Sequence, residues 1–191
     1  MHVTLSKRLS AIASFVPHGS ALADIGTDHA LIPVYLVGKG ICPRAIAGDV
    51  HPGPAQAAER QVKRANLEHK IDVRLGDGFA VLKPGEAETA VIAGMGGGTI
   101  RDILSAADLD ALGIRNLVLQ PNVGERTVRE WLFANGWMLL DEALLEEDGQ
   151  SYEIITAERG RPDEAAAYNE RLYTRPLPGA GHPSREIRLL M

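Results

Sequence analysis

The sequence predicts an α/β fold in which a doubly wound, mostly parallel sheet of seven strands ends in an antiparallel hairpin strand. Three observations favour it. Short apolar runs typical of buried strands alternate with segments of helical periodicity. Glycine follows most of these runs, where the chain must turn as it leaves a strand. Near residue 150, two strand-like segments flank an acidic turn without room for a crossover helix, which indicates an antiparallel hairpin.

The N-terminal part reads as one helix followed by strand–helix units. Leu5, Leu9 and Ile12 recur at helical spacing, and apolar segments that end near glycine or aspartate follow. Pro33 is expected to break the second helix early. The expected elements are a helix over 5–16, a strand over 21–25, a helix through 37, a strand over 44–48, a helix over 53–66 and a strand over 71–75.

The second part continues the alternation and then ends it. A glycine-rich stretch follows the fourth strand, and Gln120-Pro121-Asn122 follows the fifth. The pattern of alternating units implies a Rossmann-like sheet, with helices on both faces. The expected elements are strands over 89–93 and 116–119, helices over 99–107 and 125–135, and hairpin strands over 137–145 and 152–157.

Length and composition bound the domain organisation. The 191 residues fit one domain, over 1–159, and a short Pro/Gly-containing tail over 160–191 with one possible helix at 163–172. The single cysteine, Cys42, excludes an intrachain disulfide and a cysteine-built zinc site. No apolar stretch approaches the ~20 residues of a membrane helix, and no secretory signal is evident. We therefore expect a cytoplasmic protein, with a monomer favoured.

Charge is distributed unevenly along the chain. The net charge of −5 argues mildly against a nucleic-acid partner, yet residues 1–75 carry nine Lys/Arg against six Asp/Glu. This half is the candidate RNA contact face, because phosphate contacts dominate RNA affinity. The alternative is that these residues form ordinary solvated helix faces. The candidate RNA-binding residues are Lys7, Arg8, Arg60, Lys63 and Arg64.

Polar and glycine-bearing loops follow successive strands of the predicted sheet. In such sheets ligands bind beyond the carboxyl ends of the strands, where strand order reverses. A phosphate-binding turn would need several glycines, whereas the first turn holds one glycine and two carboxylates, which suit the ammonium and sulfonium of S-adenosylmethionine. Each aspartate alone could be a simple loop or cap residue. The predicted cofactor-binding residues are Asp24, Gly26, Thr27, Asp28, His29, Asp49, Asp77, Gly78, Gly94, Met95 and Gly96.

Three of these residues have a more specific expected role. Asp49 is placed to accept the two ribose hydroxyls, Asp77 to accept from the adenine amino group, and Met95 to pack on an adenine face. His29 is assigned to the cofactor loop and not to a base, since a lone histidine beside a strand end is more often structural. The histidines are scattered without ligand spacing, so we expect no metal.

Seven motifs together resemble the bacterial tRNA (adenine-22-N1)-methyltransferase family, over about residues 5–158. They are Leu5-Ser6-Lys7-Arg8-Leu9, Ala23-Asp24-Ile25-Gly26-Thr27-Asp28-His29, Gly76-Asp77-Gly78, Ile92-Ala93-Gly94-Met95-Gly96-Gly97, Leu119-Gln120-Pro121-Asn122, Arg129-Glu130-Trp131-Leu132 and Glu146-Glu147-Asp148-Gly149. The resemblance implies methyl transfer from S-adenosylmethionine to N1 of an adenine in the D-arm region of tRNA. The chain departs from the family at Asp49, where members often have Glu, and after residue 160, where members carry a helical extension that helps to grip tRNA.

The implied reaction needs alignment more than proton transfer. N1 of neutral adenine already offers a lone pair, and positioning alone can supply ~7–11 kcal/mol. The predicted catalytic residues are Gln120 and Asn122, which would orient the adenine by hydrogen bonds, and Asp28, which could offset the charge of the methylated base. The alternative for Gln120-Pro121-Asn122 is a simple turn.

Three other functions stay open on the sequence. An NAD-linked oxidoreductase could share the fold, although the glycines of a dinucleotide site are missing. A methyltransferase acting on protein, DNA or a metabolite is compatible with the acidic balance. A non-catalytic module that binds S-adenosylmethionine or RNA is the third.

Overall fold

The computed structural model describes residues 3–161, 164–165, 167–168 and 188–190 and contains one mixed β-sheet. The strands lie in the order β3-β2-β1-β4-β5-β7-β6-β8. Their bounds are β1 Leu22–Ile25, β2 Ala45–Asp49, β3 Ile71–Leu75, β4 Thr89–Gly96, β5 Asn116–Val123, β6 Trp137–Glu147, β7 Gln150–Arg159 and β8 Arg188–Leu190.

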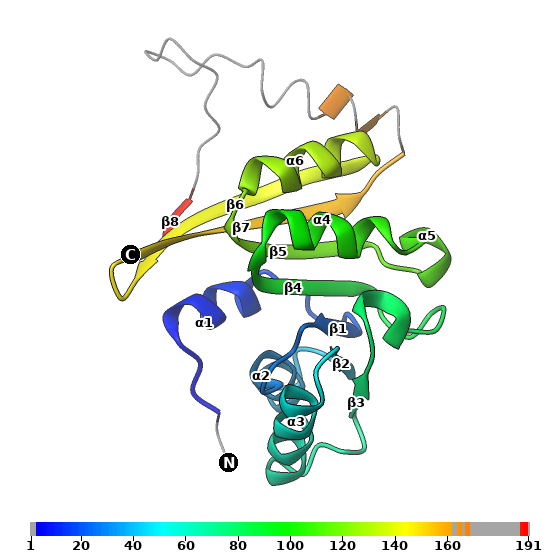
Figure 1. Cartoon of the computed structure of the whole chain (residues 1–191), viewed down its shortest axis with the longest axis vertical. Helices are drawn as coiled ribbons and strands as arrows, with labels where there is room; N and C mark the ends of the chain where they lie inside the picture. The colour runs from blue at the N-terminus through cyan, green and yellow to red at the C-terminus, as the bar shows by residue number, and fades with distance from the viewer. Residues whose placement is uncertain (1–2, 162–163, 166, 169–187, 191) are drawn as a thin grey trace.

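Helices cover both faces of the sheet (Figure 1). On one face, Ile12, Leu36 and Val62 bring three helices into one apolar cluster with the sheet. On the other face, Ile100 and Leu132 belong to a second cluster. The first face holds α1 Lys7–Ser14, α2 Leu31–Gly38 and α3 Pro52–Arg64, and the second holds the 3-10 helix η1 Gly78–Val81 with α4 Gly97–Ser105, α5 Leu109–Leu112 and α6 Glu125–Ala134.

The topology confirms the predicted doubly wound sheet with an antiparallel hairpin strand. Strands β1 to β5 are parallel, and the chain winds from β1 toward β3 on one side and through β4 to β5 on the other. The strand order therefore reverses between β1 and β4, which is where such sheets bind ligands. Strand β7 lies antiparallel between β5 and β6, as a tight hairpin requires.

Two details of the predicted elements are wrong. Pro33 does not break the second helix, because it is the third residue of α2, where an N–H would have no acceptor within the helix. Strands β4 and β5 extend beyond their predicted ends, so Gly94 to Gly96 and Gln120 to Asn122 belong to strands. The ladder between them shifts register on both sides of Met95, which lets these polar segments face the site.

The C-terminal tail differs from expectation in its last described residues. The backbone of Arg188–Leu190 pairs in parallel with β6 as an eighth strand. Without it, β6 would be an open edge with unpaired N–H and C=O groups. Residues 164–165 and 167–168 are helical, and the rest of the helix predicted at 163–172 lies outside the described residues.

Candidate functional site

A cavity of about 550 Å³ opens beyond the carboxyl ends of strands β1 to β4, in the size range of small-molecule sites. It gathers residues from four strand ends that are far apart in the sequence. The predicted cofactor-binding residues that line it are Asp24, Gly26, Thr27, Asp28, His29, Asp49, Asp77, Gly78, Gly94 and Met95. Gly96, the remaining one, is the N-cap residue of α4, directly after Met95.

Asp24 is the most unusual carboxylate of the cavity. It lies buried on β1, only 5% exposed. The hydroxyl of Thr27 donates to its Oδ2 at 2.6 Å. Burial raises the pKa of Asp24 to about 6, the Thr27 bond opposes this, and the negative charge of Asp49 adds to the rise. The protein thus holds a carboxylate whose ionised form is costly until a cation comes near it.

The loop after β1 holds an unusual backbone shape. Asp28 and Ala30 have φ values of 51° and 52°, in the left-handed region that only glycine adopts without strain. Gly26 also has a positive φ, and the methyl end of Met95 occupies the space where a Cβ at Gly26 would lie. Met95 thus packs on Gly26 of the first turn, and the predicted packing of Met95 on an adenine stays untested.

Asp49 and Asp77 lie at the ends of β2 and β3. The buried Asp49 accepts from the N–H of His51 at 2.8 Å and from that of Asp28 at 3.4 Å, and each carboxylate oxygen keeps a second lone pair. Asp77 is exposed, between two glycines, and begins η1. Val81 of η1 fills the space where a Cβ at Gly76 would lie, so this glycine lets η1 approach the strand ends closely.

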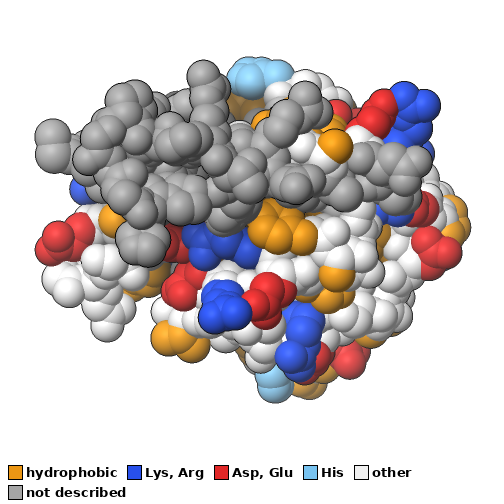
Figure 2. All heavy atoms as spheres, turned by 90° about the horizontal axis from the view of Figure 1, so that it is seen from above, with side chains coloured by type: hydrophobic (Ala, Val, Ile, Leu, Met, Phe, Trp, Pro, Cys, Tyr) orange, Lys and Arg blue, Asp and Glu red, His pale blue; other side chains and the backbone are white. Residues whose placement is uncertain are grey.

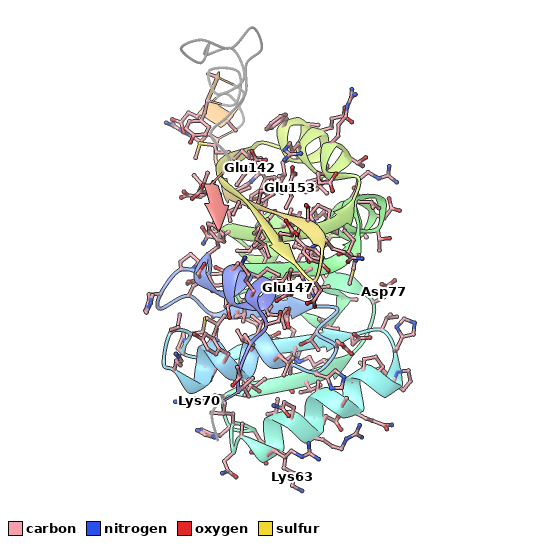
Figure 3. All side chains as sticks on the ribbon, turned by 90° about the vertical axis from the view of Figure 1, so that its left-hand side faces the viewer. Lys63, Lys70, Asp77, Glu142, Glu147 and Glu153 are labelled. Carbon is pink, nitrogen blue, oxygen red and sulfur yellow. The ribbon has the colours of Figure 1, made fainter. Side chains whose placement is uncertain are left out.

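Helix α1 crosses to the site because the distant hairpin holds its first turn (Figure 3). Glu147 accepts from the hydroxyl of Ser6 at 3.1 Å and from the N–H of Arg8 at 3.3 Å, so it caps the helix from across the chain. The ammonium of Lys7 donates to the backbone carbonyl of Glu146 at 3.1 Å. Arg8 and Leu9 consequently line the cavity.

A hydrogen-bonded network joins α1 to the end of β5. The guanidinium of Arg8 donates to Oε1 of Gln120 at 2.6 Å and lies 5.3 Å from the centre of the Tyr152 ring. The buried Gln120 donates to Oδ1 of Asn122, and Asn122 donates to the carbonyl of Gly94 at 2.9 Å. Gln120 therefore positions Arg8 and Asn122, and direct contact of Gln120 with a substrate would require these bonds to break.

A second, open cavity of about 490 Å³ lies beside this network. It is lined by Asn122, Gln150, Ser151 and Tyr152. Arg8 lies over the Tyr152 ring and also lines the first cavity, and Asn122 is bonded to Gly94 of the first cavity. The hydrogen bond from Asn122 to Gly94 thus joins a residue that lines the second cavity to one that lines the first.

The residues of the first cavity fit S-adenosylmethionine. The buried Asp24 is stabilised by a nearby positive charge, which the ammonium or sulfonium of this molecule carries. Asp49 keeps free lone pairs for hydroxyl donors, and Gly94 and Gly78 leave the backbone open to a ligand. A diphosphate would meet four carboxylates here, which argues against a dinucleotide.

The candidate RNA-binding residues fall into two groups. Arg60, Lys63 and Arg64 are exposed on α3, and Figure 3 shows Lys63 far from Asp77 and Glu147. Lys7 and Arg8 lie on α1, and of these two Arg8 lines the first cavity. On the face drawn in Figure 2, the Lys/Arg and Asp/Glu side chains of the described residues are interspersed. The structure does not bring the five candidates together as one basic cluster, and their RNA contact stays a prediction.

Several lining residues were not predicted. Leu31 and Ile32 come from the first turn of α2, and Thr99 and Ile103 come from one side of α4, four residues apart. The signal that could have found Leu31, Ile32 and Thr99 is position: the first turn of a helix that follows a site strand faces the same edge of the sheet. His29 is exposed, and its Nε2 lies 3.7 Å from Oδ1 of Asp28; its assignment to the cofactor loop stays a prediction.

Two features are absent from the described residues. These residues contain no group of three or more His, Cys, Asp or Glu side chains that could hold a metal ion. In the part of the chain that the structure describes, no helix is both long and apolar enough to span a bilayer.

Comparisons with known proteins agree on one kind of enzyme. Residues 5–155 match the family model described as a methyltransferase domain. The chain is 47% identical to the tRNA (adenine(22)-N(1))-methyltransferase of Bacillus subtilis (strain 168), over 86% of this chain and 68% of that protein. The crystal structure of the B. subtilis m1A22 tRNA methyltransferase superposes with a TM-score of 0.82 at 46% identity, over 88% of this chain and 71% of that chain.

Two further solved structures contain ligands. Streptococcus pneumoniae Sp1610 in complex with S-adenosyl-L-methionine superposes with a TM-score of 0.80 at 42% identity, over 83% of this chain and 74% of that chain. The M. capricolum homologue, solved with S-adenosyl-homocysteine, superposes with a TM-score of 0.77 at 29% identity, over 84% and 70%.

Proposed function

The chain belongs to the tRNA (adenine-22-N1)-methyltransferase family, and from this premise we propose that it transfers a methyl group from S-adenosylmethionine to N1 of adenine 22 in tRNA. The observation that supports it best is the cavity at the reversal of strand order, lined by four aspartates and open glycines. A dinucleotide oxidoreductase is disfavoured by the same carboxylates.

The cofactor would lie along the strand ends. Asp77 and Gly78 would receive the adenine, and Asp49 the ribose hydroxyls. The loop after β1, with Asp24 and Asp28, would receive the positively charged methionine part. This order follows the spatial order β3, β2, β1 of the strands that carry these residues.

The reaction needs a well-placed nucleophile and no strong base. When bound, S-adenosylmethionine supplies a methyl group on a positively charged sulfur, and that C–S bond breaks as the N1 lone pair of adenine forms the new N–C bond. The protein contributes by holding the base in line and by excluding water. The exposed carboxylate of Asp28 could offset the positive charge that the methylated base acquires.

The target base would enter through the second cavity. Asn122 lies on its wall and is bonded to Gly94, so it is the polar group best placed to orient an adenine edge beside the first cavity. Gln120 would support it from behind. Lys7, Arg8, Arg60, Lys63 and Arg64 are the candidate contacts with RNA phosphates, and the monomeric state, the cytoplasmic location and the domain boundary at residue 159 stay predictions.

The test is incubation with S-adenosylmethionine and an unmodified tRNA transcript, followed by nucleoside mass spectrometry. We expect N1-methyladenosine in the transcript, and none in a matched transcript with guanine at position 22. Asn122→Ala should lower the rate at saturating tRNA by ~10- to 100-fold, since a misplaced nucleophile is costly. Methylation of protein or DNA but not of tRNA, or cofactor binding without turnover, would favour the two alternative functions.

A further inference from the structure

Arg8 has an unusual place in the first cavity. Among the described residues that line this cavity, it carries the single Lys or Arg side chain, whereas four lining residues are aspartates. Its guanidinium approaches the cavity from α1, so that a Cβ at Gly94 would lie 3.6 Å from its Nη1. A cation thus faces the cavity beside Gly94 of β4, the strand next to the one that carries Asp24.

The fold holds this cation in position from three sides. Glu147 caps the first turn of α1, Gln120 accepts from Nη1 of Arg8 at 2.6 Å, and the ring of Tyr152 lies against the guanidinium. A guanidinium has five N–H donors, and the bond to Gln120 uses one of them. The half-buried Arg8 therefore retains donors that can serve a ligand in the cavity.

The chemistry of the methyl donor supplies a partner for these donors. With its adenine at β3 and its ribose at β2, the methionine part falls at β1 and β4, between Asp24 and Arg8. That part carries an ammonium, which suits aspartate, and a carboxylate, which aspartates would repel. We propose that Arg8 binds the methionine carboxylate of the methyl donor, so that Arg8 is a cofactor-selecting residue.

This inference rests on the proposed function for the identity of the donor, and it changes the role of one residue. Arg8 is then a cofactor contact, where the charge pattern alone suggests an RNA contact. Lys7, its neighbour, is exposed and bonded to the backbone of Glu146. The two adjacent cations should therefore differ in what they recognise.

The first experiment compares two ligands on the unaltered protein by isothermal titration calorimetry. One ligand is S-adenosylhomocysteine, and the other is its decarboxylated analogue, S-adenosyl-3-thiopropylamine, which keeps the ammonium. A charge-assisted hydrogen bond predicts ~10- to 150-fold tighter binding of the ligand with the carboxylate. Equal affinity for the two ligands would overturn the proposal, whatever any variant does.

The second experiment repeats both titrations with Arg8→Gln. We expect binding of S-adenosylhomocysteine to weaken by ~10- to 150-fold, and binding of the decarboxylated analogue to change by less than about threefold. Arg126→Gln is the matched control, because it makes the same substitution at an exposed arginine of α6 that pairs with Glu130 and does not line the cavity, and it should leave both affinities unchanged. Equal weakening of both ligands by Arg8→Gln would show general damage to the cavity and would contradict direct pairing.

Failure of this inference and failure of the proposed function give different results. If the unaltered protein methylates tRNA but does not discriminate between the two ligands, the role of Arg8 is wrong and the function stands. If Arg8→Gln selectively weakens the ligand with the carboxylate but the unaltered protein forms no N1-methyladenosine in tRNA, the role of Arg8 stands and the proposed substrate is wrong.

Discussion

The rim of the sheet that holds the site and the outer edge beside β3 differ in how their carboxylates are paired. At the rim, Asp24 is buried with a hydroxyl as its hydrogen-bond donor, and its pKa is raised to about 6. At the outer edge, Arg74 pairs with Glu86 at 2.6 and 2.9 Å and also with Asp72. The bonds from Arg74, together with one from the N–H of Lys83, lower the pKa of Glu86 to about 2.

The difference shows that the rim, and not the outer edge, gives up folding stability in exchange for ligand binding. A carboxylate that is costly to ionise is available to a cationic ligand, whereas one that is already paired stabilises the fold alone. The backbone follows the same division, since Asp28 and Ala30 of the site loop take up left-handed conformations. Substitutions at three places in the molecule test this comparison.

The largest effect is expected where two backbones meet at the rim. A Cβ at Gly97, the first residue of α4, would collide with the carbonyl oxygen of Gly124, which cannot move like a flexible side chain. Gly97→Ala should therefore lower the free energy of unfolding by about 3 kcal/mol, as measured by urea denaturation.

Gly98→Ala is the matched control for this change. The next residue of the same helix has open space where its Cβ would lie, and alanine is the better helix former. It should leave stability unchanged or raise it by up to ~1 kcal/mol. Equal losses in the two variants would refute the close backbone contact.

The second effect concerns the pH dependence of Asp24. Its folded pKa is above the ordinary value of 3.8, so the native state binds the extra proton between about pH 4 and 6, and stability falls as pH rises through this window. The cost above pH 6 is about 3 kcal/mol. Asp24→Asn should remove it, so that the ligand-free variant is more stable at pH 7.5 and equal to the unaltered protein near pH 3.

Binding should change in the opposite direction. Because the ionised Asp24 attracts the cationic ligand, affinity for S-adenosylmethionine should fall up to ~10-fold per pH unit below 6, and Asp24→Asn should show a weaker, pH-independent affinity. Thr27→Val, which removes the hydroxyl donor, should move the transition above pH 6. A difference in stability between Asp24→Asn and the unaltered protein that does not vary with pH would count against this assignment.

The smallest effect is expected at the outer edge. Glu86→Gln should cost about 1 kcal/mol of stability, since the pair is partly exposed to solvent. The folded pKa of Glu86 lies below its ordinary value of 4.5, so this contribution is present above pH 4.5 and disappears as pH falls toward 2. Calorimetric affinity for S-adenosylmethionine should stay within about twofold, and a larger change would link this edge to the site.

Local patterns in the sequence were sufficient for the fold and for the four aspartates of the cavity. Alternation of apolar runs and helices predicts a parallel sheet, and in such a sheet every strand end meets the same rim, so Asp24, Asp49, Asp77 and Gly94 could be placed together from their positions alone. Two features were not predicted, because they depend on neighbours in space: the place of Pro33 at the third residue of α2, and the extension of β4 and β5 beyond their predicted ends.

Tertiary structure alone decided that α1 lines the site. Arg8 and Glu147 are 139 residues apart, and Arg8 and Gln120 are 112 apart, so no local pattern relates them. Periodicity places Arg8 on the polar side of a helix, which reads as a solvated or RNA-facing residue. The hairpin β6–β7 turns that helix onto the rim, because a carboxylate that caps a helix and a buried amide that accepts from a guanidinium act over distance in space, not in sequence.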